Sequence, residues 1–168
     1  MPEITTPREL FLHELGDILY VERKLAEETL PKLIHEVEDR EFTAGLEKHL
    51  RETRRHVTNV ERVFKSMGET PQAEECIGFE GLKSEHDSLS EEASEALIDL
   101  VDLGAAARTE HYEIAAYEGL IKMARALGES DAVAPLEQNL KQEKEALREI
   151  EKLTTRLTKE QAKEFAPA

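Results

Sequence analysis

The chain has 168 residues, of which 39% are hydrophobic and 35% charged, and its formal net charge at pH 7 is −15. A surface this negative repels phosphate groups, which argues against nucleic acid and anionic membranes as partners. Cys76 is the only cysteine, so no disulfide forms within the chain, and no apolar segment approaches the roughly 20 residues of a membrane span. The polar N-terminus shows no signal-peptide core, and a cytoplasmic setting is expected.

Long stretches rich in Ala, Leu, Glu, Lys and Arg predict helices, and four long ones follow in chain order. Residues 6–9 form a capping box with Pro7 at the first helical position, which starts a helix at about 7–37. Pro31 lies inside that helix and must bend or split it. A second helix is expected at about 40–67, because Gly68 is placed to end it.

The second half of the chain repeats this plan after a longer connection. Residues 68–79 contain glycine and proline and predict a crossover loop, with a short helix near 80–86 inside the connection. The third and fourth helices are expected at about 91–127 and 131–157, and residues 158–168 are expected to fray. The pattern predicts one all-α domain over residues 1–168, an up-down four-helix bundle with a long crossover between the second and third helices.

Three of the four predicted helices carry glutamate in the middle of their apolar stripe. Each stripe repeats at alternating steps of three and four residues, as core-facing positions do. The acids in these stripes are Glu22 on the first helix, Glu110 and Glu113 on the third, and Glu143 on the fourth. Taken singly, a glutamate at such a position is more often a boundary residue whose carboxylate reaches water.

The second helix carries its polar groups on a stripe beside the apolar one. His49, Glu52 and His56 lie there at intervals of three and four residues. Glu22 and Glu52 are 30 residues apart, as are Glu113 and Glu143, which brings both pairs to about the same level in antiparallel hairpins. The pattern is equally consistent with the two histidines as metal ligands and as surface or hydrogen-bonded residues.

Several carboxylates at one level of a core require neutralisation, because burying even one alone costs several kcal/mol, on the order of 5. Two divalent metal ions would provide it, since Glu and His from four helices build carboxylate-bridged dimetal sites in bundles. Oxygen-rich ligation favours iron or manganese over copper. The sequence therefore predicts two divalent ions inside the bundle, with iron favoured over manganese.

At these residues the sequence resembles the YciE/YciF-type ferritin-like proteins. Residues 15–22, 49–53 and 110–117 carry the resemblance, and shorter matches lie at 76–82 and 140–144. It implies a ferritin-like four-helix fold, a homodimer and a dimetal centre in a family linked to bacterial stress responses, with no defined reaction. The ligands implied by the matching motifs are Glu22, His49, Glu52, Glu110, Glu113 and Glu143.

The chain departs from the wider ferritin-like pattern of Glu-x-x-His on two helices. Arg55 follows Glu52 at that spacing, and Ala146 follows Glu143, so whether His56 joins or replaces His49 as a ligand is open. The expected function is that of a metal-binding stress protein, with oxidation of ferrous iron or handling of peroxide as candidate reactions. The alternative is a non-catalytic helical dimer or scaffold in which buried acids fix helix register.

Apolar residues beside the main stripes give a further reason to expect a homodimer. Phe11, Ile18 and Phe64 lie beside or outside the predicted core seam. An exposed apolar strip of this kind usually marks an interface.

Overall fold

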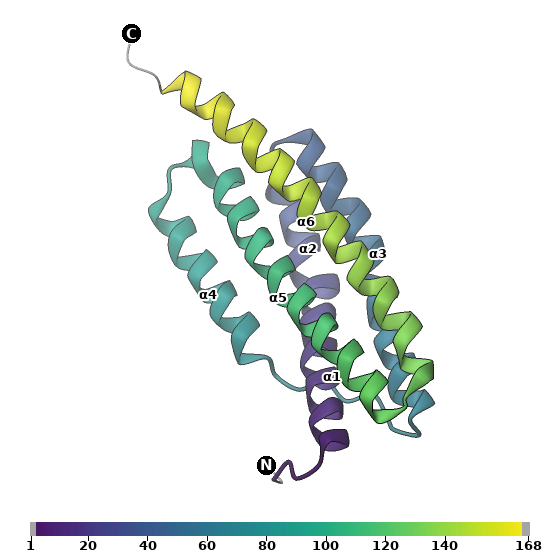
Figure 1. The fold of residues 1–168 in the computed structure, drawn as a ribbon. Helices are drawn as coiled ribbons and strands as arrows, with labels where there is room; N and C mark the ends of the chain where they lie inside the picture. The colour runs from purple at the N-terminus through teal and green to yellow at the C-terminus, as the bar shows by residue number, and fades with distance from the viewer. Residues whose placement is uncertain (1–2, 166–168) are drawn as a thin grey trace.

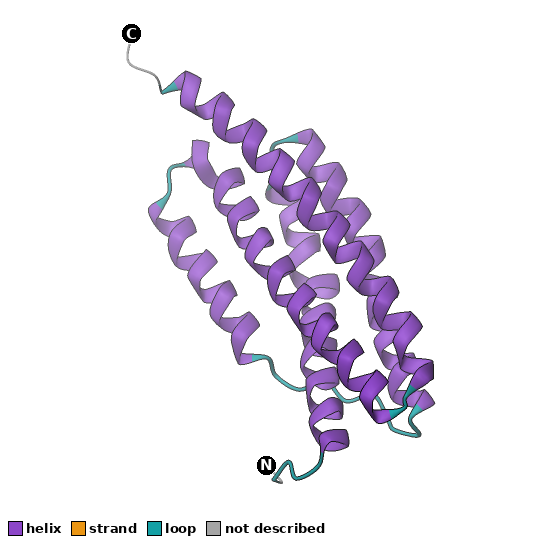
Figure 2. Cartoon of the chain, in the orientation of Figure 1, coloured by secondary structure: helices purple, strands orange, loops and turns teal. Residues whose placement is uncertain are grey.

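The computed structural model describes residues 3–165 as helices joined by short loops, with no strand in that range (Figure 2). The long helices run side by side as two antiparallel pairs, and α4 lies against the outside of the bundle (Figure 1). α1 packs on α3, α3 on α6, α6 on α5 and α5 on α1, which closes a ring of four around a common core. This arrangement confirms the all-α four-helix bundle.

The first helical segment is split as Pro31 requires. α1, Pro7–Lys24, begins with the predicted capping box, in which the backbone N–H of Glu9 donates to the Thr6 hydroxyl and the Thr6 N–H donates to the Glu9 carboxylate. A π-helical turn, Leu25–Thr29, then leads into α2, Leu30–Glu36. Pro31 has no N–H to donate to the preceding turn, and the wider π turn accommodates that missing bond.

The remaining helices differ from the predicted boundaries mainly in the crossover. α3 spans Arg40–Ser66, and α4, Ile77–Glu92, is far longer than the short helix expected there. The third bundle helix starts later than predicted: after a 3₁₀ turn, Glu95–Leu97, α5 runs Ile98–Leu127. Helix α4 begins before residue 80 because Cys76 accepts the N–H of Phe79 at its start and Phe79 is buried.

The last helix also exceeds its prediction. α6 spans Ser130–Glu164, so residues 158–164 are helical and not frayed, while 166–168 lie outside the described residues. Arg156 explains part of this, because it contacts both Asp39 at the start of α3 and Glu160 one turn further along α6. None of the helices within residues 3–165 is both long enough and apolar enough to cross a membrane.

The flanking apolar residues that predicted a dimer interface belong to the core of the chain itself. Phe11 and Ile18 are 0% exposed and Phe64 is 3% exposed. The expectation that these three side chains form an exposed strip was wrong, whereas the homodimer itself stays a prediction. The apolar face of α1 is wider than one seam, because α1 packs against both α3 and α5. The segment before α4 also contacts α1, because the N–H of Glu74 in that segment donates to the carbonyl of Gly16 on α1 at 3.0 Å.

This close contact makes Gly16 a testable part of the fold. A Cβ at Gly16 would lie 2.8 Å from the backbone oxygen of Gln72. We expect Gly16→Ala to destabilise the chain by about 1–3 kcal/mol, because backbone cannot yield as a side chain does. The matched control is Gly119→Ala within α5, where a Cβ meets nothing within 4 Å and helix propensity favours alanine by about 0.5–1 kcal/mol. Urea denaturation of both variants checks this, and equal effects would contradict the contact.

Candidate metal centre

Glutamate and histidine from four helices meet in the middle of the bundle as two triads that share Glu143. One triad is Glu22, His56 and Glu143, and the other is His49, Glu110 and Glu143. In each triad one ligand atom per residue lies within 4.8 Å of the others. All five residues are buried.

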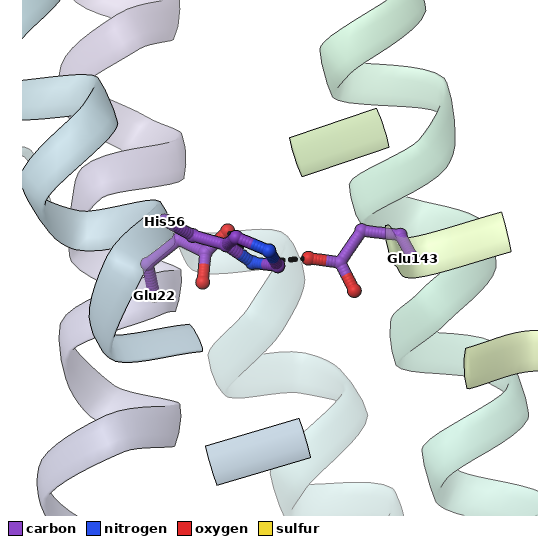
Figure 3. A group of neighbouring side chains, drawn as sticks. All are labelled: Glu22, His56 and Glu143. Atoms are coloured by element: carbon purple, nitrogen blue, oxygen red, sulfur yellow. Dashed lines mark ion pairs between the residues drawn. The ribbon is translucent and has the colours of Figure 1, made fainter. Parts of the chain in front are cut away.

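The first triad is sealed from solvent. Glu22 on α1 and His56 on α3 lie side by side and face Glu143 on α6 (Figure 3). His56 Nδ1 is 2.7 Å from Glu143 Oε1 and 3.3 Å from Glu22 Oε1, and all three side chains are 0% exposed. The site therefore offers one imidazole nitrogen between two carboxylates.

The second triad lies about two helical turns away along α3. His49 Nε2 is 3.3 Å from Glu110 Oε1 and 3.9 Å from Glu143 Oε2. His49 remains 8% exposed and Glu110 4% exposed, in contrast to the sealed triad. Glu143 thus turns one carboxylate oxygen toward each histidine, the position of a carboxylate that bridges two ions.

The carboxylates on α5 are energetically costly when no cation is present. Burial raises the pKa of Glu110 well above its ordinary value, and the charges of Glu143 and Glu113 raise it further. Burial likewise raises the pKa of Glu113, with Glu143 and Glu22 adding to the effect. Both oxygens of Glu113 are buried without a hydrogen-bond partner, as is Oε2 of Glu110.

His56 is the main positive charge available to this cluster. Burial lowers its pKa, but Glu22 and Glu143 outweigh burial and raise the pKa of His56 to about 11. For Glu143, burial acts to raise the pKa, yet contacts with His56 and His49 bring it below its ordinary value. A metal ion at Nδ1 would replace the proton that His56 carries in the metal-free chain.

A hydrogen-bond chain fixes which nitrogen of His56 faces the carboxylates. Gln142 Nε2 donates to Glu52 Oε1 at 3.2 Å, because an amide NH₂ group can only donate. The Gln142 carbonyl therefore faces His56, and His56 Nε2–H donates to it at 3.0 Å. Nδ1 is left to face Glu22 and Glu143, which is the outer support that metal-binding imidazoles usually have.

Glu22 is held by a second chain of hydrogen bonds. The Tyr117 hydroxyl donates to Glu22 Oε1 by a short bond and accepts from Asn139 Nδ2 at 3.0 Å. Asn139 in turn accepts from Asn59 Nδ2 at 2.8 Å. Tyr117 is 0% exposed, and burial together with the charge of Glu22 raises the pKa of its phenol well above its ordinary value.

The structure brings four of the six predicted ligands into the triads. Glu113 lies beside them with two unpartnered oxygens, whereas Glu52 belongs to neither triad and bonds to Gln142. It stays a prediction that Glu52 reaches an ion. His56, left open by the sequence, is at the centre of the sealed triad; its place seven residues after His49, on one face of α3, was the available signal.

The donor set fits divalent metal ions of the iron and manganese kind. Each triad supplies one imidazole nitrogen and two carboxylates, and no sulfur ligand is present in either. Unpartnered oxygens of Glu22, Glu110 and Glu113 remain as further ligand atoms. Both triads could therefore hold a metal ion.

Fold and site together define a ferritin-like four-helix bundle with buried glutamate and histidine triads that could hold metal ions. The chain belongs to the family described as a domain of unknown function, DUF892, whose model matches residues 6–163. It is 29% identical over 141 residues to protein YciF of Escherichia coli (strain K12), covering 83% of this chain and 84% of that protein. The resemblance to YciF-type proteins is thereby confirmed.

Solved structures agree with this assignment. The E. coli stress protein YciF matches with a TM-score of 0.85 and 26% identity, covering 93% of this chain and 99% of that one. YcfI from Rhodopseudomonas palustris matches with a TM-score of 0.85 and 37% identity, covering 89% of this chain and 95% of that one. The ferritin-like fold is confirmed by these matches.

The buried acids predict an inverse dependence of metal-free stability on pH. The folded pKa values of Glu110 and Glu113 lie above 4.5, and that of His56 lies above 6.5, so the folded chain binds more protons than the unfolded chain. The stabilisation is complete below these ordinary values and is lost as the pH rises through the folded pKa values. We expect the melting temperature of metal-free protein to fall between about pH 5 and pH 8.

Glu113→Gln isolates the contribution of one acid to this slope. The variant should melt higher than wild type at about pH 8, by at least the 2–4 °C that corresponds to about 1 kcal/mol in a chain of this size. It should also show a shallower pH dependence. Glu14→Gln, at an exposed position on α1, is the control and should leave the slope unchanged. Equal slopes for wild type and Glu113→Gln in thermal scans without metal would contradict the buried charge.

Proposed function

We propose that the chain binds two divalent metal ions in its core, iron in preference to manganese, and acts in a stress response by oxidising ferrous iron or by handling peroxide. The observation that supports this most is the sharing of Glu143 by two triads in a core where Glu113 has two unpartnered oxygens. The relative YciF is described as a stress protein, and that role is extended to this chain as part of the proposal.

Each ion has its own set of ligands apart from Glu143. Glu22 and His56 would hold the ion in the sealed triad, and His49 and Glu110 the ion in the more accessible one. Glu113 would complete either set, because Glu143 and Glu22 are the charges that act on it most. Glu52 is retained as a proposed ligand on the accessible side, with its bond to Gln142 as its role in the metal-free chain.

A pair of ferrous ions would supply the electrons that reduce dioxygen or peroxide. The chain itself would then contribute positioning and proton control. Gln142 keeps His56 Nδ1 directed at the centre, and the Tyr117 hydroxyl holds a proton on the Glu22 oxygen side of the sealed triad. The slight exposure of His49 and Glu110 marks the side from which a small reactant would reach the centre.

The rival proposal is a non-catalytic scaffold whose buried acids fix helix register. The ion pairs of His56 with Glu22 and Glu143 favour it, since they compensate part of the charge without metal. Glu113 argues against it, because a register-fixing acid would have hydrogen-bond partners and Glu113 has none.

We also propose that the chain forms a homodimer with a complete metal centre in each bundle. One chain supplies every residue of both triads, so no ligand has to come from a partner. Apolar side chains on the outer side of the crossover support an interface there, since Leu89 is 42% and Leu97 36% exposed. A mass of two chains by light scattering is the expected result.

Substitution of single acids shows whether the chain binds two metal ions or only one. In anaerobic titrations with ferrous iron we expect wild type to bind about two ions per chain. Glu143→Gln should weaken both, by at least about 10–100-fold, because even supporting residues of a metal site contribute that much. Glu22→Gln and Glu110→Gln should each weaken one ion and spare the other.

Glu145→Gln is the matched control for these variants, since Glu145 is on α6 two residues from Glu143 and lies outside both triads. It should leave both binding constants unchanged. Absence of saturable ferrous binding by wild type would exclude the metal proposal and leave the scaffold. An aerobic assay of ferrous oxidation and peroxide consumption on the same variants then distinguishes a catalytic from a storage or structural centre.

A further inference from the structure

A cavity of about 300 Å³, walled by α4 and the bundle helices, lies next to the more accessible triad. Its walls come from the π turn, α2, α3, α4, α5 and α6. His49, Glu52 and Glu110 line it, whereas no residue of the pair Glu22 and His56 does. The cavity therefore leads to one of the two proposed ion positions and not to the other.

Most of the cavity wall is apolar. Leu46, Phe79, Ala106, Ile150 and Leu153 are among its lining residues. Dioxygen and peroxide need no apolar chamber of this size, which at about 30 Å³ for each water-sized group has room for about ten non-hydrogen atoms. Ligand sites in proteins typically combine such an apolar wall with a few polar groups at one point.

Polar groups line the cavity at two positions, and only those at one position have hydrogen-bond partners. His86 Nε2 and Asp102 Oδ1 pair with each other at 2.7 Å, so neither needs a ligand. His49 Nδ1 and Glu110 Oε2 are buried without a hydrogen-bond partner. The polar end of a ligand is thus expected at His49 and Glu110, beside the accessible triad.

The charge at that end selects the kind of polar group. Glu52 and Glu110 both line the cavity there. Of the lysines that also line it, Lys48 pairs with Glu149 at 2.8 Å, Lys32 pairs with Glu36 at 3.8 Å, and Lys83 lies on α4. The acids beside His49 would therefore repel a carboxylate ligand. A hydroxyl or carbonyl oxygen has no charge, and it is also a suitable ligand for the hard divalent ions proposed here.

We propose that this cavity binds a small organic molecule with an apolar body of about ten non-hydrogen atoms and one neutral oxygen group, placed at His49 and Glu110. A medium-chain alcohol or aldehyde has this chemistry. The position of the oxygen rests on the proposed metal function, whereas the cavity itself is present in the metal-free chain.

Calorimetric titration of the metal-free chain with straight-chain primary alcohols tests the cavity. Affinity should rise about fourfold for each added methylene, the value that corresponds to burial of one CH₂, and should stop rising near 1-nonanol, when the cavity is full. Nonanoate should bind at least about tenfold more weakly than 1-nonanol, because of the acids at the inner end. Absence of saturable binding, or a rise that continues well beyond nine or ten carbons, would overturn the cavity as the site.

Filling the cavity provides the matched variants. Ala106→Phe places a ring in the cavity one turn before Glu110 and should abolish 1-nonanol binding. If Ala106→Phe does not fold, the smaller change Ala106→Leu is used instead, and it should weaken 1-nonanol binding. Ala115→Phe, at an exposed position on the same helix, should bind as wild type does. Unchanged binding by a folded Ala106 variant would overturn the proposal.

Cobalt substitution separates this inference from the metal proposal. Addition of 1-nonanol should change the visible absorption of the cobalt(II)-loaded wild type and not that of Ala106→Phe. Alcohol binding without a spectral change would overturn the placement of the oxygen at the ion. If cobalt does not bind at all, the metal proposal fails, and the alcohol titrations of the metal-free chain still decide the cavity.

Discussion

Negative charge buried in the bundle core is the constraint on which the rest of this structure depends. Glu22, Glu113 and Glu143 are 0% exposed and Glu110 is 4% exposed, yet four carboxylates cannot all ionise together in such a place. In the metal-free chain His56 holds a proton, with its pKa raised to about 11, and the raised pKa values of Glu110 and Glu113 keep protons there too. Two divalent ions would replace these protons and satisfy the oxygens that now lack partners.

The helices are arranged so that this charge has one centre. His49 and His56 lie on one face of α3 and reach the two oxygens of Glu143, while Gln142 and Asn139 on the same stretch of α6 support His56 and the Tyr117–Glu22 pair. α6 thus carries both the carboxylate that the two triads share and the groups that orient its neighbours. The same arrangement makes the metal-free protein less stable than an apolar core would, which is the usual relation between function and stability at such sites.

The sequence predicted the bundle well because its signals are local and periodic. The capping box at Thr6, the left-handed Gly68, and the glutamates in the core stripes each depend on a few neighbouring residues. What could not be predicted depends on contacts between distant segments. Phe11 and Ile18 are buried on α1, which packs against α3 and α5 and contacts the chain before α4 at Gly16, and α4 packs on α5.

The same distinction applies to the centre. The acids on α1, α5 and α6 were identifiable by their stripe positions, but whether His56 or Glu52 faces inward depends on the rotation of α3 about its axis. Gln142 gave no signal as a support for His56, since its partner is 86 residues away.

Anomalous X-ray diffraction from crystals grown anaerobically with ferrous iron tests the central claim, that two metal ions bind at Glu143, most directly. Two iron peaks, one beside each oxygen of Glu143, are the predicted result. A core without an iron peak, in crystals grown with ferrous iron in excess over the protein, would contradict it.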